Sequence, residues 1–319
     1  MAKKIRVDKP FLPITKQISH LKKQGLAFSD IKAAKTILQT HSYYSLVNCY
    51  CDLLISQRSP RVFKPGATFE ELMAIRDFDT GFRRFLLPQI LFIEEKLNAT
   101  VINAYSSHKK ADGTFAHFQD DYLCMDSYET TTIEKRVAAT KLIIQLDKAI
   151  QNCEKKNPIK YALGHYGYVP LWILATQMTF GQMSKFFECN VPAIRNEVSK
   201  IYQLNERQLR TILKIINVIR NCCAHSNVIY GVNIPNKLPS TLGIGTTPTV
   251  VDPACYHKFG SVLYCLRFLL SENKFVKIIK ELGNELRKLK KALKTVPFEM
   301  VLKKMGISKA MVSSFGIVV

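Results

Sequence analysis

Residues 205–231 read NERQLRTILKIINVIRNCCAHSNVIYG, and this stretch decides the predicted fold. Asn205 followed by Gln208 matches a capping box, which predicts that a helix begins there. Apolar side chains then recur at steps of three and four residues, so they share one face of that helix. They are Leu209, Ile212, Leu213, Ile216, Ile219 and Cys223. A face this apolar needs other helices to cover it.

The opposite face of the same helix carries a polar stripe. Its members also recur at steps of three and four residues, and they are Arg210, Lys214, Asn217, Asn221 and His225. The stripe is basic, ends in an imidazole and precedes a long loop. Such an arrangement could hold a phosphodiester beside a group that transfers protons.

Residues 69–107 carry the longest helical pattern in the chain. Pro88 interrupts it once, and we expect this proline to kink the helix or to split it in two. Asp79 and Arg83 are spaced to form an ion pair between successive turns, a structural role.

Helical spacing also dominates elsewhere, and no run of alternating residues predicts a convincing strand. Asp30 is predicted to cap a helix over residues 31–41, and residues 134–153 read as an amphipathic helix. Residues 171–178 and 182–187 predict a pair of helices around Gly181. We therefore predict an all-α protein.

Two segments depart from this pattern and define the expected domain organisation. Residues 231–253 are rich in Gly, Pro and Thr, and we expect a long flexible loop within a helical domain of residues 1–272. Residues 273–319 are expected to form a basic helical extension packed on that domain. Lys288 and Lys291 lie in its most basic part, which is either a solvated helix face or a surface that follows phosphates.

The charge of the chain indicates an anionic partner. Lysine and arginine number 46 against 25 acidic residues, which gives a formal charge of +21. Nucleic acid and acidic membranes are the usual partners of such proteins. The longest apolar runs reach only about half a bilayer span, and the first residues lack a signal-peptide core, so we expect a cytoplasmic protein without membrane contact. Nine cysteines without a pairing pattern agree with a reducing compartment.

Metal and cofactor sites are not predicted. No Cys-x-x-Cys pair occurs, and His165 and His225 have no cysteine at a spacing that would complete a zinc site. Phosphate-binding glycine loops are absent as well, since Gly243 and Gly245 precede no helix signal. Chemistry driven by a bound nucleotide is therefore not expected.

Seven blocks of the sequence, spread over nearly the whole chain, carry a resemblance to a known family. They are KPFLPITKQISHLKKQGL (9–26), HSYYSL (41–46), FKPGATFEEL (63–72), FDTGFRRFLLPQILFIEEKL (78–97), VPLWILATQMTFGQMSKFF (169–187), VIRNCCAH (218–225) and MGISKAM (305–311). The most specific of them contains Arg220, Asn221 and His225, an arginine and a histidine separated by four residues. Together the blocks resemble the Abi family of abortive-infection proteins, of the AbiD/AbiF type, and this family is similar to HEPN-fold ribonucleases.

This resemblance implies a HEPN-like helical bundle with additional N- and C-terminal helices, acting as a metal-independent endoribonuclease toxin in anti-phage defence. His225 would transfer protons, and Arg220 would stabilise the phosphate. Asn221 would orient either the phosphate or the imidazole. The 2′-hydroxyl of RNA would attack, which leaves a cyclic phosphate. Of the residues that follow the signature in relatives, only Tyr230 is matched in this chain. Upstream, Ser45 stands where relatives often carry an arginine.

The residues expected to contact RNA are those of the polar stripe and the basic extension, together with the matching tyrosine. They are Arg210, Lys214, Asn217, Tyr230, Lys288 and Lys291.

Helix geometry adds a constraint on the oligomeric state. On a regular helix, Arg220 and His225 lie about 140° apart, so one chain brings them together poorly unless the helix ends or distorts near Ala224. A homodimer in which both signatures line one cleft solves this problem, and the resemblance implies it.

Other functions remain open. A non-catalytic RNA-binding protein, of the small-RNA or toxin–antitoxin type, would use the same basic surface. A DNA-binding repressor needs a recognition helix that the sequence does not offer. A toxic ribonuclease also needs restraint, so a small RNA or a protein antitoxin is an expected partner.

Overall fold

The structure is a computed structural model that describes residues 11–108, 113–114, 118–153 and 158–319. Lys9 and Pro10, which open the first resemblance block, lie outside the described residues. The described part is helical apart from two small two-stranded sheets, so the prediction of an all-α protein is confirmed. Of the described helices, none has both the length and the apolar character needed to cross a membrane.

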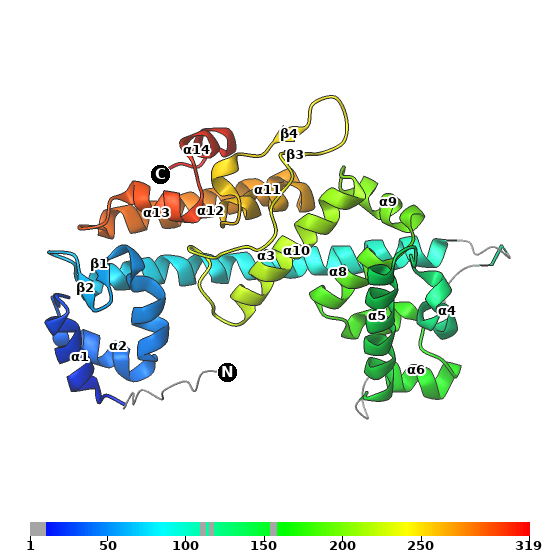
Figure 1. Cartoon of the computed structure of the whole chain (residues 1–319), viewed down its shortest axis with the longest axis horizontal. Coiled ribbons are helices and arrows are strands. Elements are labelled where there is room, and N and C mark those ends of the chain that lie inside the picture. Colours follow the sequence, from blue (N-terminus) through cyan, green and yellow to red (C-terminus); the bar gives the residue numbers. More distant parts are fainter. Residues whose placement is uncertain (1–10, 109–112, 115–117, 154–157) are drawn as a thin grey trace.

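A single long helix, α3 (Phe69–Ser107), forms the spine of the molecule (Figure 1). Thr68 caps it by accepting a hydrogen bond from the backbone N–H of Glu71, and Pro88 lies inside it. The helix continues through Pro88, so it is not split there. Leu86 and Ile90 are both fully buried on either side of the proline, and this packing offsets the roughly 3 kcal/mol that a proline costs inside a helix.

Small groups of helices cover the two ends of α3 (Figure 1). At its N-terminal end lie α1 (Ile14–Lys23), α2 (Ile31–Thr40), the turns η1 (Tyr44–Asn48) and η2 (Cys51–Leu53), and the hairpin β1 (Ile55–Arg58) and β2 (Arg61–Phe63). At its C-terminal end lie α4 (Gln119–Leu123), η3 (Met125–Ser127), α5 (Ile133–Gln151), α6 (Pro158–Tyr166), α7 (Leu171–Leu174), η4 (Ala175–Gln177), α8 (Phe180–Cys189) and α9 (Pro192–Ile201). Asp30 caps α2 as predicted, accepting from the N–H of Ala33.

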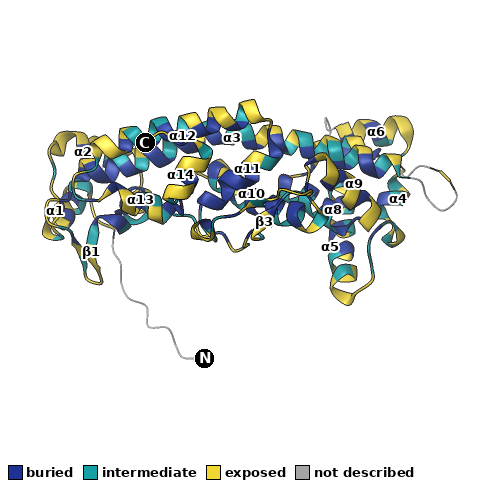
Figure 2. Ribbon diagram, turned by 90° about the horizontal axis from the view of Figure 1, so that it is seen from above, coloured by how far each residue is buried: buried dark blue, intermediate teal, exposed yellow. Residues whose placement is uncertain are grey.

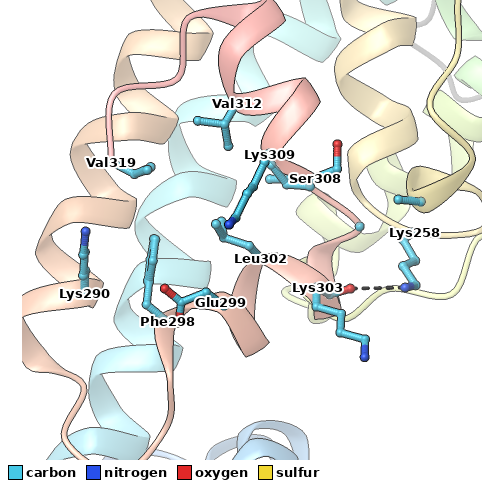
Figure 3. A pocket seen from close by; sticks show the side chains of 13 residues that line it. Lys258, Lys290, Phe298, Glu299, Leu302, Lys303, Ser308, Lys309, Val312 and Val319 are labelled. Atoms are coloured by element: carbon cyan, nitrogen blue, oxygen red, sulfur yellow. Dashed lines mark hydrogen bonds between the residues drawn. The ribbon is translucent and has the colours of Figure 1, made fainter.

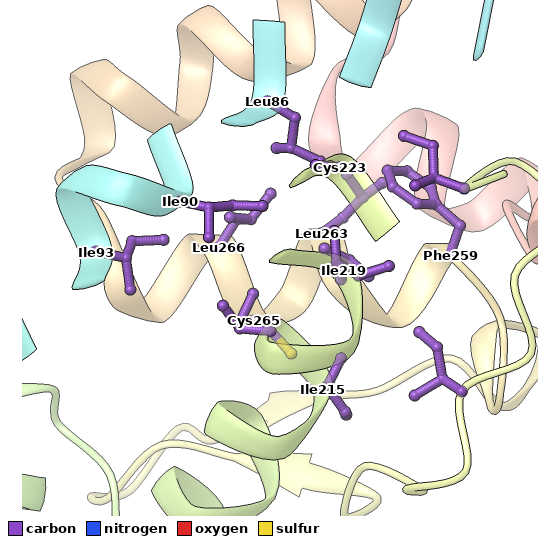
Figure 4. Close-up of a cluster of buried hydrophobic side chains, with 14 of the residues drawn as sticks. Leu86, Ile90, Ile93, Ile215, Ile219, Cys223, Phe259, Leu263, Cys265 and Leu266 are labelled. Carbon is purple, nitrogen blue, oxygen red and sulfur yellow. The ribbon is translucent and has the colours of Figure 1, made fainter. Parts of the chain in front are cut away.

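The central helix α10 (Glu206–Ala224) begins at the predicted capping box. The Asn205 side chain accepts from the N–H of Gln208 at 2.9 Å, and the Gln208 side chain accepts from the N–H of Asn205 at 3.1 Å. Its predicted apolar face is buried, and Figure 4 shows side chains of this face between α3 and α11 (Gly260–Leu269). Both the predicted start of this helix and its predicted buried face are therefore confirmed.

The predicted pair of helices around Gly181 is placed wrongly by a few residues. The break falls at Met178 and Thr179, and Thr179 caps α8 through a second capping box with Gln182. Gly181 lies inside α8, where a Cβ atom would stand 3.4 Å from the side-chain amide of Asn217. The glycine therefore allows α8 to approach α10 closely and does not break a helix.

Residues 231–253 pack on the body although no helix forms in them. They contain a short hairpin of β3 (Thr241–Leu242) and β4 (Thr249–Val250), and the turn η5 (Pro253–Cys255) follows. Ile234, Leu238 and Leu242 are buried. The Gln208 side chain also donates to the Thr241 carbonyl at 3.2 Å, so the start of α10 and this loop support each other.

The C-terminal helices are α12 (Glu272–Ala292), α13 (Phe298–Met305) and α14 (Lys309–Phe315). Helix α12 lies along α3, as Figures 1 and 2 both show, and the sequence colours of Figure 1 show that the two helices run in opposite directions. The buried Glu71 carboxylate near the start of α3 accepts from the backbone N–H groups of Lys294, Thr295 and Val296 at 2.8–3.0 Å. The basic extension is thus tied to the body along its whole length.

Candidate functional site

Helix α10 ends inside the Arg220–His225 signature. Ala224 is its last residue, His225 caps it with φ −100° and ψ 13°, and Ser226 turns the chain away with φ 57°. The side chains of Asn221 and His225 are exposed.

Arg220 lies on a different side of α10 and is engaged with α3. Its Nε atom stands 3.5 Å from an Oε atom of Glu94, and 26% of its side chain is exposed. Among the described residues, no hydrogen bond or ion pair joins Arg220 to His225. The two signature residues therefore diverge within one chain, in line with the helix geometry.

The upstream half of the polar stripe faces carboxylates. Lys214 pairs with Glu188 at 2.8 Å, and Lys185 pairs with the same carboxylate at 3.0 Å. Burial raises the pKa of the Glu188 carboxyl, but hydrogen bonds from the two lysines outweigh it and hold that pKa below its ordinary value. Arg210 shares a depression of about 190 Å³ with Glu188 and Glu129. The Lys214 ammonium, which was predicted to contact RNA phosphates, is therefore already paired with a carboxylate of the protein.

Tyr230 requires a correction. Only 1% of it is exposed, its ring stacks on Tyr50 with centroids 6.0 Å apart, and its hydroxyl donates to Asp52. Lys304 of α13 pairs with the same carboxylate. Tyr230 is therefore a core residue that joins the turn after α10 to the C-terminal helices, and its ring is not available to stack on RNA.

The predicted ion pair of Asp79 and Arg83 is confirmed at 3.2 Å, and it anchors this same turn. One Asp79 oxygen accepts from the N–H groups of Ile229 at 3.0 Å and Tyr230 at 2.7 Å, and the other accepts from the Tyr50 hydroxyl at 2.9 Å. Arg83 also donates to the Asn227 carbonyl at 3.2 Å. Burial raises the pKa of the Asp79 carboxyl, while Tyr230 N–H and Arg83 oppose that shift.

A cavity of about 310 Å³ opens beside this anchor, and we call it the arginine pocket. It brings together the end of α10, the middle of α3 and the segment between α2 and η2. Its lining holds three arginines, a histidine and no carboxylate, which suits an anion. The lining residues are His41, Ser45, Tyr50, Arg76, Thr80, Arg83, Arg84, Leu87, Cys223 and Ser226.

None of the arginines of this pocket was predicted as a site residue from sequence. One feature of the sequence could have pointed to the pocket. Its histidine and two of its arginines lie in two of the resemblance blocks, in the stretches HSYYSL and FDTGFRRF. The first block runs into a π-helical turn over Tyr44–Asn48, a conformation that is frequent at functional sites. His41 Nδ1 lies 2.9 Å from the Thr40 hydroxyl and 3.2 Å from the Ile37 carbonyl.

Lys288 and Lys291 lie on another helix, α12, and both are exposed. Lys288 pairs with Glu285 at 2.5 Å. Both lysines line a shallow depression of about 260 Å³ with Asn284 and Arg287, and that depression shares no lining residue with the arginine pocket. The structure thus leaves these lysines as a separate basic surface.

Within the described ranges, no three His, Cys, Asp or Glu side chains gather in a group that could hold a metal ion.

Comparison with known proteins identifies the family. Residues 36–231, more than half of the 319-residue chain, match the family model described as Abi-like protein. The comparisons with curated proteins and with solved structures each gave no match. The matched range includes the Arg220–His225 signature and every residue that lines the arginine pocket. The chain therefore belongs to the Abi-like protein family.

Proposed function

We propose that this protein is a metal-independent endoribonuclease toxin of abortive infection, the defence that its family suggests. One observation carries the proposal. The signature histidine is exposed at the end of α10, and the same helix end contributes Cys223 and Ser226 to a pocket lined by three arginines. A proton-transfer group beside a cluster of guanidinium groups is what cleavage of a phosphodiester requires.

In this mechanism the arginine pocket holds a phosphate of the RNA chain next to the scissile bond. His225 takes the proton from the 2′-hydroxyl or gives one to the 5′-oxygen. The O2′ atom bonds to phosphorus while the P–O5′ bond breaks, which leaves a 2′,3′-cyclic phosphate and a 5′-hydroxyl. Asn221, also exposed on the last turn of α10, orients the phosphate or the imidazole.

Arg220 enters the site most simply through a homodimer. Its partner Glu94 lies on the same side of α3 as Leu91 and Leu87, because these two positions are three and seven residues before it. Leu91 is 47% exposed, which provides an apolar contact beside Arg220 for a second copy of the chain. A two-fold contact along this side of α3 would place the Arg220–His225 signatures of the two protomers on opposite sides of one cleft.

The test compares wild type and His225→Ala on total cellular RNA in excess EDTA. We expect cyclic-phosphate fragment ends from the wild type and none from the variant. His165→Ala, which removes an exposed histidine from α6, is the matched control and should cleave like the wild type. Equal cleavage by wild type and His225→Ala would contradict the proposal.

A second function, RNA binding without cleavage, is favoured by one specific observation. The 3.5 Å contact with Glu94 leaves Arg220 occupied within its own chain. A pure binding protein would retain RNA in a salt-sensitive manner, leave it intact, and show the same affinity in His225→Ala. The same purification would reveal a bound small RNA or protein antitoxin.

A further inference from the structure

The C-terminal helices line a second cavity, of about 520 Å³, which is open to the surface and lies outside the residues that the family model matches. Its walls come from the segment after η5, from α12, α13 and α14, and from the loop at 306–308 (Figure 3). Gly306 closes the loop tightly, since it has φ 70° and a Cβ atom there would stand 2.8 Å from the Cβ atom of Lys258. Gly306 therefore lets the backbone at the edge of the cavity pass close to Lys258.

Four lysines surround this cavity and only one acidic residue, Glu299, lines it. Lys258 donates to the Lys303 carbonyl at 3.1 Å, and the Lys290 ammonium lies 5.4 Å from the centre of the Phe298 ring. Lys309 reaches across the opening toward Leu302 (Figure 3). Among the described residues, no ion pair joins these four lysines to a carboxylate. The lining of this cavity therefore carries a net positive charge, which favours an anionic ligand.

The floor between the lysines is apolar. It is formed by Phe298, Leu302, Ile307, Val312 and Val319. Phe298 and Ile307 are buried, with 8% and 3% of their surfaces exposed. The cavity therefore fits a ligand with an anionic part and a compact apolar or flat part, and its volume limits that ligand to a small molecule or the end of a chain.

Glu299 narrows the choice of ligand. A fatty acid carries only acceptor oxygens, so this carboxylate would repel its head group and bond to nothing on its tail. A nucleobase offers N–H donors to the carboxylate and a flat face to the floor, and its phosphate matches the lysines. We propose that this cavity binds a nucleoside phosphate, either free or at the 5′ end of an RNA strand.

Isothermal titration of the full-length protein tests this inference directly. The probes are GMP, AMP, inorganic phosphate, a 5′-phosphorylated trinucleotide and the same trinucleotide with a 5′-hydroxyl. We expect at least one mononucleotide to bind about tenfold or more tightly than inorganic phosphate, because a charge-assisted hydrogen bond and the apolar floor add to the phosphate contact. A free nucleotide as ligand predicts that the mononucleotide binds best, and an RNA end predicts that the 5′-phosphorylated trinucleotide does.

Variants locate the binding. Lys290→Gln and Lys309→Gln should each weaken nucleotide binding several-fold, while Lys277→Gln, an exposed lysine on α12 outside the cavity, should not. Glu299→Gln should weaken nucleotide binding and leave phosphate binding unchanged.

Either of two results would overturn the inference. One is that no nucleotide or phosphorylated trinucleotide binds more tightly than inorganic phosphate. The other is that Lys290→Gln and Lys309→Gln bind nucleotide as well as Lys277→Gln does, with thermal unfolding showing all variants folded.

Discussion

At the scale of single residues, Asp79 holds the candidate site in shape. Its buried carboxylate satisfies Arg83, the Tyr50 hydroxyl and two backbone N–H groups of the turn after α10. Asp79→Ala would leave a buried guanidinium and these donors without a partner, so we expect a loss of about 3–5 kcal/mol in the free energy of unfolding. Urea denaturation measures it.

The neighbouring Asp77 provides the control. Its side chain is 68% exposed and pairs only with Arg76 at the surface, so Asp77→Ala should change stability by about 1 kcal/mol or less. Similar losses for the two alanine variants would show that the Asp79 network does not anchor the turn.

Arg84 is the residue through which the arginine pocket can be tested for phosphate contact. It is exposed on α3 and lines the pocket, while Arg83 is committed to Asp79. If Arg84 neutralises one phosphate, Arg84→Ala should reduce the slope of log affinity against log salt by about 0.7 for single-stranded RNA. Fluorescence anisotropy at several salt concentrations gives this slope, and Arg207→Ala, at an exposed position on α10, should leave it unchanged.

At the scale of elements, local signals predicted helix starts well and tertiary contacts poorly. The caps at Asp30 and Asn205 depend on atoms within three residues, so the sequence contains them. The burial of Tyr230 depends on Asp52 and Asp79, which lie 178 and 151 residues away in the chain, and no spacing rule predicts such contacts. The arginine pocket was missed for the same reason, since three distant segments converge to form it.

Pro88 shows what packing does to one element. Helix α3 passes through it, although the proline removes a hydrogen bond to the Arg84 carbonyl. Because Pro88 is exposed, alanine fits there without a clash, and we expect Pro88→Ala to stabilise the protein by about 1–3 kcal/mol. Thermal and urea unfolding would measure the gain, with Gln89→Ala as the control for the alanine itself. An unchanged or lower stability would mean that proline costs this position nothing in the folded protein.

At the scale of the whole molecule, α3 connects the turn after α10, Arg220 and the C-terminal helices. The turn after α10 is anchored to it by Asp79, Arg220 is paired to it through Glu94, and the C-terminal helices are tied to its first turn by Glu71. Since α12 packs against α3, the C-terminal helices support the same spine that carries the arginine pocket. The fold therefore positions the site as one unit, and what it leaves apart are Arg220 and His225.

That separation makes the proposed homodimer testable by complementation. If each site takes Arg220 from one protomer and His225 from the other, Arg220→Ala and His225→Ala are both inactive alone, yet a mixed dimer regains one intact site. Random exchange makes about half of the dimers mixed, so co-refolded or co-expressed variants should recover about a quarter of wild-type cleavage. A mixture as inactive as its components, in a protein that light scattering shows to be dimeric, would instead require Arg220 and His225 of the same chain to act together. In that case Arg220 would have to leave Glu94, and Glu94→Gln should then raise the rate of cleavage.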